Sequence, residues 1–255
     1  MTTTPAPARP AGSWHPAPGV TPRGTLLLLP GRGEHPGVYA RFGRRLAFDG
    51  YTVHALADRA DGDGLSARVA EARTAPGPVV LAGSDTGALR ALAAAGQARP
   101  DALLLAAPPA TEPGPAAQDG TPDWSDELAA RTACPVHRGL LAEDPGFRPG
   151  RLALAVPADL AGAARAAAPD LPVLLLHGDA DPVAPPAGAR RLAARLPGAE
   201  LLLVAGGLHD VLNDAAHRTV AAQIVQWLER LRLGPDLPRL LIHVPPSAPQ
   251  EGTRP

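Results

Sequence analysis

The residues best suited to chemistry lie in the segment Val79–Gly87, which reads VVLAGSDTG. An apolar run leads there into a Gly-x-x-x-Gly turn, and an Ala-rich helical pattern follows. This is the layout of a nucleophile elbow, a strained strand-to-helix turn that pushes its central side chain out beyond the sheet. Gly83 and Gly87 provide the space that the turn needs. The central residue is Asp85, and the hydroxyl-bearing Ser84 lies one position too early.

A second candidate group is a carboxylate in the segment LLHGDADP, which follows another apolar run. Asp179 and Asp181 would lie there at the carboxyl end of a strand, where open α/β sheets build their sites. We assign Asp179 to an ordinary turn. Asp181 is the better catalytic acid, because Pro182 and the loop to Pro185 would hold it in front of the next helix.

The candidate base is His209, in the segment GGLHD. Among the eight histidines it combines a glycine-opened loop, a place at the sheet edge and an acid earlier in the chain. Asp181 would orient the ring, and a neutral imidazole could take a proton from water beside Asp85. Two neighbouring carboxylates should also raise the pKa of His209. We therefore predict that these three side chains converge.

Predicted strands and helices alternate along most of the chain. Continuous apolar runs predict strands at Thr25–Leu29, Tyr51–Ala57, Pro78–Ala82, Ala102–Ala106, Val173–Leu176 and Leu201–Val204. Helical patterns are expected near Val38–Phe48, Leu65–Ala72, Thr86–Ala95, Ala187–Leu196 and Ala216–Leu231. Strands that are apolar throughout suit a parallel sheet buried on both faces, so the pattern predicts an α/β fold.

Residues 108–172 interrupt this alternation with a loop-like part and two helices, expected around Trp124–Arg131 and Ala158–Ala168. A long insertion after a strand is usually functional, and we interpret this one as a cap. Trp124 and His137 are its candidate substrate-binding residues. The α/β core would then comprise residues 13–107 and 173–232. The Pro-rich ends, 1–12 and 233–255, are expected to be tails, the first of them disordered, and Leu240–Val244 could add a short extended piece.

The composition limits the partners. The 255 residues fit one domain with an insertion, and a net charge of −1 favours neither nucleic acid nor an anionic membrane. A single cysteine, Cys134, excludes an intramolecular disulfide and a Cys-based zinc site, and we expect no metal and no cofactor. Without an apolar run of roughly 20 residues or a signal-peptide pattern, we expect a cytoplasmic protein that acts on a small molecule. The oligomeric state stays open.

Together these segments resemble the α/β-hydrolases, in particular the monoacylglycerol lipase, lysophospholipase-like and serine aminopeptidase-like group. The resemblance covers roughly Gly24–Leu231 and keeps the order of nucleophile, acid and histidine as Asp85, Asp181 and His209. It implies an α/β-hydrolase fold, with a mostly parallel sheet flanked by helices and a small cap insertion.

The resemblance also suggests an oxyanion site. The run Gly31–Glu34 matches the oxyanion segment of that group, with Pro30 where histidine is usual. Glycines there allow close backbone approach, and free N–H groups can point at an oxyanion. The implied donors are the backbone N–H groups of Arg32 and Thr86.

The elbow departs from this group, which has serine where this chain has Asp85. Haloalkane dehalogenases and epoxide hydrolases use aspartate there. A carboxylate that attacks an sp³ carbon gives an alkyl ester that a His-activated water can hydrolyse, whereas attack on an acyl carbon would give a mixed anhydride. However, Thr86 stands where dehalogenases usually place tryptophan. Epoxide hydrolases use tyrosines of the cap to donate to the opening oxygen, whereas the two tyrosines here, Tyr39 and Tyr51, precede the cap.

Several functional hypotheses remain. In the leading one, an enzyme uses Asp85 either as a covalent nucleophile or together with His209 to activate water directly. A serine esterase would need Ser84 to take the centre of the turn. In the alternative from another class, the chain is a catalytically silent hydrolase fold that binds a ligand or a partner.

Overall fold

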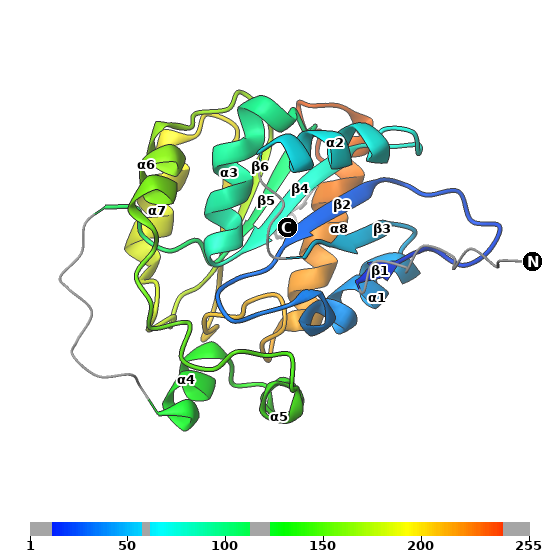
Figure 1. Cartoon of the computed structure of the whole chain (residues 1–255). Helices are drawn as coiled ribbons and strands as arrows, with labels where there is room; N and C mark the ends of the chain where they lie inside the picture. The colour runs from blue at the N-terminus through cyan, green and yellow to red at the C-terminus, as the bar shows by residue number, and fades with distance from the viewer. Residues whose placement is uncertain (1–11, 58–61, 113–122, 242–255) are drawn as a thin grey trace, which may run out of the picture.

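The computed structural model describes residues 12–57, 62–112 and 123–241 (Figure 1). Within these ranges, strands form one seven-stranded sheet in the order β1-β3-β2-β4-β5-β6-β7. Neighbours from β3 to β7 pair in parallel, and β1 pairs antiparallel with β3 at the edge. The strands are β1 (Ser13–Trp14), β2 (Thr25–Leu29), β3 (Thr52–Ala55), β4 (Val79–Ser84), β5 (Ala102–Ala106), β6 (Val173–Gly178) and β7 (Ala199–Val204).

Helices cover both faces of the sheet (Figure 1). One face packs against α1 and α8, and the other against α2, α3, α6 and α7. The helices are α1 (Ala40–Phe48), α2 (Gly62–Ala72), α3 (Thr86–Ala98), α4 (Trp124–Arg131), α5 (Pro135–Glu143), α6 (Ala158–Ala166), α7 (Pro186–Arg195) and α8 (His217–Leu233), with a 3₁₀ turn η1 (Pro36–Tyr39) before α1. The predicted parallel α/β sheet is confirmed.

The apolar runs in the strands follow from this two-sided burial. In β2, Leu26 and Leu28 pack on the side of α1 and α8, while Leu27 and Leu29 pack on the side of α3. Each of these leucines is at most 2% exposed. Burial removes apolar surface from water on both faces, which stabilises the fold by roughly 25 cal/mol per Å².

The turn after β4 has the backbone of an elbow. Asp85 has φ 51° and ψ −125°, and α3 begins at the next residue. A Cβ atom on Gly83 would lie 2.2 Å from the carbonyl oxygen of Gly87, and one on Gly87 would lie 2.1 Å from that of Leu29. Both positions therefore require glycine, and the strained turn places Asp85 at the carboxyl end of the strand.

The expected insertion divides into two parts in the structure. Helices α4 and α5 lie together beyond the carboxyl ends of the strands, whereas α6 stands beside α3 and α7 (Figure 1). Ala164 of α6 is fully buried among the apolar residues of that helix layer. This differs from the single insertion that we expected over residues 108–172. Of the two expected tails, residues 1–11 and 242–255 lie outside the described ranges, and with them most of Leu240–Val244.

Two glycines of α3 offer a test of the elbow. We expect Gly87→Ala to lower the free energy of unfolding by about 2 kcal/mol or more, because its methyl group would overlap the backbone of β2. Gly96→Ala adds the same methyl group to the same helix where no atom lies within 4 Å, so it should change stability little or raise it by up to ~1 kcal/mol. Urea unfolding of both variants measures the difference, and equal losses would contradict the tight-turn interpretation.

Candidate active site

Asp85 is held at the start of α3 by Arg32. The guanidinium lies with Nη2 2.7 Å from Oδ1 and Nε 2.8 Å from Oδ2, and the backbone N–H of Arg32 donates to Oδ2 at 2.8 Å. The hydroxyl of Thr86 lies 3.3 Å from the same Oδ2. The Asp85 side chain is only 2% exposed, so this is a nearly buried, two-pronged ion pair.

His209 lies between Asp85 and Asp181. Its Nδ1 is 2.8 Å from Oδ2 of Asp181, and its Nε2 is 3.3 Å from Oδ1 of Asp85, a close ion pair rather than an aligned hydrogen bond. Asp181 is fixed in turn, because its Oδ1 accepts the backbone N–H groups of Val183 and Ala184 at 2.8 and 3.0 Å. The structure thus brings together the three residues expected to converge.

The charges of this site alternate along the series Arg32, Asp85, His209 and Asp181. Burial disfavours a charged His209, but its contacts with Asp181 and Asp85 prevail and raise the pKa of His209 to about 10. Burial likewise opposes ionisation of Asp85, yet His209 and Arg32 hold the pKa of that carboxyl well below its ordinary value. At neutral pH, Asp85 is therefore a carboxylate and His209 an imidazolium.

A second buried cluster lies next to this site, around Arg131 at the end of α4. Its guanidinium lies 2.8 Å from Oε1 of Glu127 and 3.2 Å from Oδ1 of Asp210, and it donates to the backbone oxygen of Arg32 at 2.7 Å. It also lies 4.9 Å from the ring centre of Phe147. Arg131 is completely buried, so it joins α4 to the loop of Arg32 and to the loop after β7.

The backbone reinforces this junction. The N–H of His209 donates to the oxygen of Ala130 at 3.3 Å, and the N–H of Asp210 donates to that of Arg131 at 2.8 Å. Glu34, on the far side, accepts from Gly31 at 2.7 Å and lies 3.9 Å from Arg131. The position of His209 is thus set by α4 as well as by Asp181.

Other candidates from the sequence lie elsewhere. Ser84 belongs to β4, and its hydroxyl interacts with Tyr39. Asp179 accepts from the backbone N–H of Gly206 at 2.7 Å, as expected for a turn residue. Trp124 packs against Phe147, with 5.3 Å between ring centres.

The buried His137 lies 3.2 Å from Asp210. Neither His137 nor Trp124 lines the cavity at the elbow. His137 pairs with Asp210 and Trp124 packs against Phe147, and their contact with a substrate stays a prediction.

Two site residues escaped the sequence analysis. Arg32 was expected to contribute only its backbone N–H, yet its side chain pairs with Asp85. Arg131 was not singled out, although Glu127 lies four residues before it, a spacing that favours ion pairs on a helix. The spacing of Glu127 and Arg131 on a predicted cap helix could therefore have indicated this ion pair.

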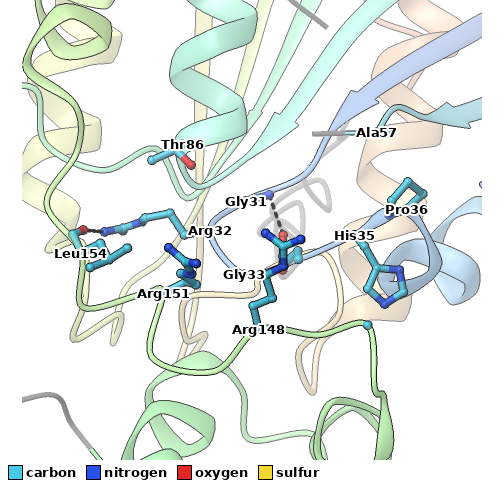
Figure 2. A pocket seen from close by; sticks show the side chains of 12 residues that line it. Gly31, Arg32, Gly33, His35, Pro36, Ala57, Thr86, Arg148, Arg151 and Leu154 are labelled. Atoms are coloured by element: carbon cyan, nitrogen blue, oxygen red, sulfur yellow. Dashed lines mark hydrogen bonds between the residues drawn. The ribbon is translucent and has the colours of Figure 1, made fainter. Parts of the chain in front are cut away.

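A cavity of about 390 Å³ opens beside the elbow (Figure 2). It reaches Thr86 and Gly31, the latter packed against Asp85. The lining residues are Gly31, Arg32, Gly33, Glu34, His35, Pro36, Ala57, Thr86, Gly146, Arg148, Arg151 and Leu154. The size suits a small organic molecule.

In the described part of the chain, no group of histidine, cysteine and acidic side chains is arranged to hold a metal ion. No helix in the same ranges is long and apolar enough to cross a membrane.

The sequence of this chain is similar to those of known proteins. Residues 155–236 match the model of the family described as TAP-like protein. The chain is 27% identical to a monoacylglycerol lipase of Mycolicibacterium smegmatis over 256 residues, which cover 83% of this chain and 90% of that protein.

Two solved structures are also similar. A monoacylglycerol lipase of Paleococcus ferrophilus matches with a TM-score of 0.65 and 22% identity, over 85% of this chain and 96% of that one. A soluble variant of monoglyceride lipase from Saccharomyces cerevisiae, in complex with a substrate analog, matches with a TM-score of 0.69 and 19% identity, over 86% and 90%.

The chain therefore has the fold of the α/β-hydrolases. Among proteins with this fold it is similar to monoacylglycerol lipases, as the sequence relative and both structures indicate.

The alternating charges of the site predict how the pKa of His209 responds when one carboxylate is removed. We expect Asp85→Asn to lower the pKa of His209 by about one to three pH units, because one of its two carboxylates is lost and Arg32 is left unneutralised. Imidazole resonances followed by NMR across pH 5–11 measure this shift. Asp179→Asn removes a carboxylate from the Asp181 loop without touching His209 and should leave its pKa unchanged. A pKa near 10 in Asp85→Asn would contradict the assigned pairing.

The buried Arg131 predicts a large stability effect. Arg131→Met leaves Glu127 and Asp210 buried without their cation, and we expect it to lower the free energy of unfolding by about 3–5 kcal/mol at pH 7. The loss should shrink as the pH falls, because protonation removes the uncompensated charges. Arg138→Met on α5, whose side chain is only half-buried, serves as the control. Equal losses for the two variants in urea unfolding would contradict the role of Arg131.

Proposed function

We propose that this chain is a hydrolase that attacks an sp³ carbon of a small organic substrate through Asp85. One observation carries the proposal: the elbow presents the Asp85 carboxylate 3.3 Å from Nε2 of His209, whose Nδ1 is held by Asp181. An elbow carboxylate beside a positioned histidine suits a covalent ester intermediate. The backbone N–H groups of Arg32 and Thr86 would then serve as oxyanion donors.

The first step in this proposal forms one bond and breaks another. An oxygen of Asp85 attacks the substrate carbon, a C–O bond forms, and the bond to halide or to the epoxide oxygen breaks with its electron pair leaving on that atom. In the second step water gives a proton to Nε2 of His209 and adds to Cγ of the ester. When that adduct collapses, the bond between Cγ and the alkoxide oxygen breaks, the proton on His209 passes to the alkoxide to give the alcohol, and the carboxylate is restored.

The charges of the site favour covalent attack by Asp85 over direct activation of water by Asp85 and His209. A separation of 3.3 Å leaves no room for water between Asp85 and His209, and a histidine with a pKa of about 10 is not a base at neutral pH. Esterification of Asp85 would remove one of the two charges that raise this pKa. His209 would then pass its Nε2 proton to the alkoxide of an opened epoxide, or to solvent when halide leaves, and the neutral imidazole would be the base that hydrolysis requires.

Access to the nucleophile requires movement of Arg32. Both carboxylate oxygens of Asp85 accept from its guanidinium, and Arg32 is also bonded to the backbone oxygen of Leu154 (Figure 2). At least one of these contacts to Asp85 has to be released before attack. We further propose that α4, α5 and the segment up to Leu154 form the cap, and we keep the cytoplasm as the proposed location.

Two alternatives rest on specific observations. The Arg32–Asp85 pair occupies the nucleophile and thus favours a catalytically silent protein that binds a ligand. The similarity to monoacylglycerol lipases favours an ester substrate, for which Ser84 would be the nucleophile. Its contact with Tyr39, rather than with His209, argues against the second alternative.

Trapping the intermediate tests the proposal. Incubation of His209→Gln with 1,2-epoxyhexane or 1-bromohexane should leave an alkyl ester on Asp85, because attack does not need the base that hydrolysis needs. Intact-mass measurement and peptide mapping of Val79–Gly87 would locate it. Asp85→Ala should abolish adduct and turnover, and Ser84→Ala should change neither by more than about twofold.

A single turnover in ¹⁸O-labelled water separates the routes. Covalent catalysis places the label in the Asp85 carboxylate, whereas direct attack by water places it in the product alcohol. Activity that survives Asp85→Ala and is lost in Ser84→Ala would replace the proposal with a serine esterase. The absence of both adduct and turnover with epoxides, haloalkanes and esters would support the silent protein.

A further inference from the structure

We infer that the substrate is a small organic anion, such as a carboxylate, whose acid group is bound by Arg148 and Arg151 at the wall of the cavity. The inference rests on the proposed function only for the reaction at Asp85. The binding of the anion is a separate property of the cavity and can be measured without turnover.

The charges that face the cavity carry this inference. Arg32, Arg148 and Arg151 line it, and the guanidinium of Arg32 is already neutralised by Asp85. Arg148 and Arg151 make no side-chain hydrogen bond or ion pair with any residue of the described ranges, so two positive charges are left without a partner. Figure 2 shows both side chains beside the cavity, with Arg151 next to Arg32.

The acidic groups of the same wall have other partners. Glu34 accepts from the N–H of Gly31 and from the hydroxyl of Tyr39, and it faces Arg131. Asp144, next to the cavity, is paired with His35 at 2.8 Å. Arg148 and Arg151 therefore remain available at the cavity wall, where two unpaired cations attract an anion.

The backbone beneath the arginines is fixed against the loop of Arg32. The N–H of Arg148 donates to the oxygen of Gly33 at 2.9 Å. A Cβ atom on Gly33 would lie 2.5 Å from the oxygen of Arg148 and 3.3 Å from Cβ of Arg151, so the two segments are in close contact. The N–H of Gly150 is bonded to Glu127. Such anchoring lowers the entropic cost of presenting two guanidinium groups to one ligand.

The rest of the cavity suits the body of such a molecule. Pro36, Ala57 and Leu154 contribute apolar surface, and the cavity extends to Thr86 beside the elbow. An anion held at Arg148 and Arg151 would direct its carbon chain along this surface toward Asp85. Carboxylates match guanidinium groups through paired hydrogen bonds, which gives the acid end its preference.

Binding of an unreactive pair of probes tests the inference. Hexanoate and hexanamide have the same carbon chain and differ in charge, and calorimetry at low salt gives both dissociation constants. We expect hexanoate to bind at least about tenfold more tightly than hexanamide. Arg148→Gln/Arg151→Gln should lose most of this preference while binding hexanamide as before. Arg44→Gln/Arg190→Gln removes the same charge from residues outside the cavity lining and should retain it.

The outcomes separate this inference from the proposed reaction. Equal binding of the two probes by the unaltered protein, or equal losses in the two double variants, would overturn the anion site even if an Asp85 adduct forms. A hexanoate preference that depends on Arg148 and Arg151 would establish the site even if no adduct is ever found. Circular dichroism of both double variants ensures that the comparison is between folded proteins.

Discussion

The buried charge of Asp85 is the constraint on which the rest of the site depends. An ionised carboxylate at 2% exposure costs several kcal/mol unless cations and N–H groups surround it. Arg32 and His209 provide these contacts, and this role fixes the position of Arg32 and the protonation of His209. Arg32 extends across the elbow and fixes its own loop, while His209 retains a proton that a histidine with one carboxylate partner would lose more readily. Asp181 then balances the charge of His209 and completes a series that is neutral as a whole.

The buried charges of the cluster around Arg131 need partners in the same way. Its guanidinium binds the backbone oxygen of Arg32 and the carboxylate of Asp210, so one side chain of α4 contacts the loops on both sides of the elbow. Buried carboxylates around one buried arginine are costly to separate, which ties α4 to the sheet. Movement of α4 would therefore disturb both Arg32 and His209. Helix α4 therefore helps to keep the charges of the site in place.

Much of this arrangement could be predicted from the sequence, and the exceptions have physical reasons. Buried parallel strands are apolar throughout, so Ala102–Ala106 was predicted with its observed bounds. The edge strand Ser13–Trp14 is too short to show a pattern, and α5 carries no clear apolar stripe. The placement of Asp85 beside His209 follows from the chain order of motifs at one sheet edge. The Arg32 side chain could not be placed, because its direction depends on a charge that becomes adjacent only in the folded chain.

Aspartate at the elbow also imposes an order on the proposed reaction. With two carboxylates beside it, His209 is an acid until one of them is neutralised. Ester formation on Asp85 is the event that neutralises one, and it simultaneously deprives Arg32 of its anionic partner. The guanidinium would then be available to the developing oxyanion, and the imidazole would be able to accept a proton once it has lost its own. The contacts of Asp85 with Arg32 and His209 therefore hold the resting site closed. Their loss on ester formation would prepare the same site for hydrolysis.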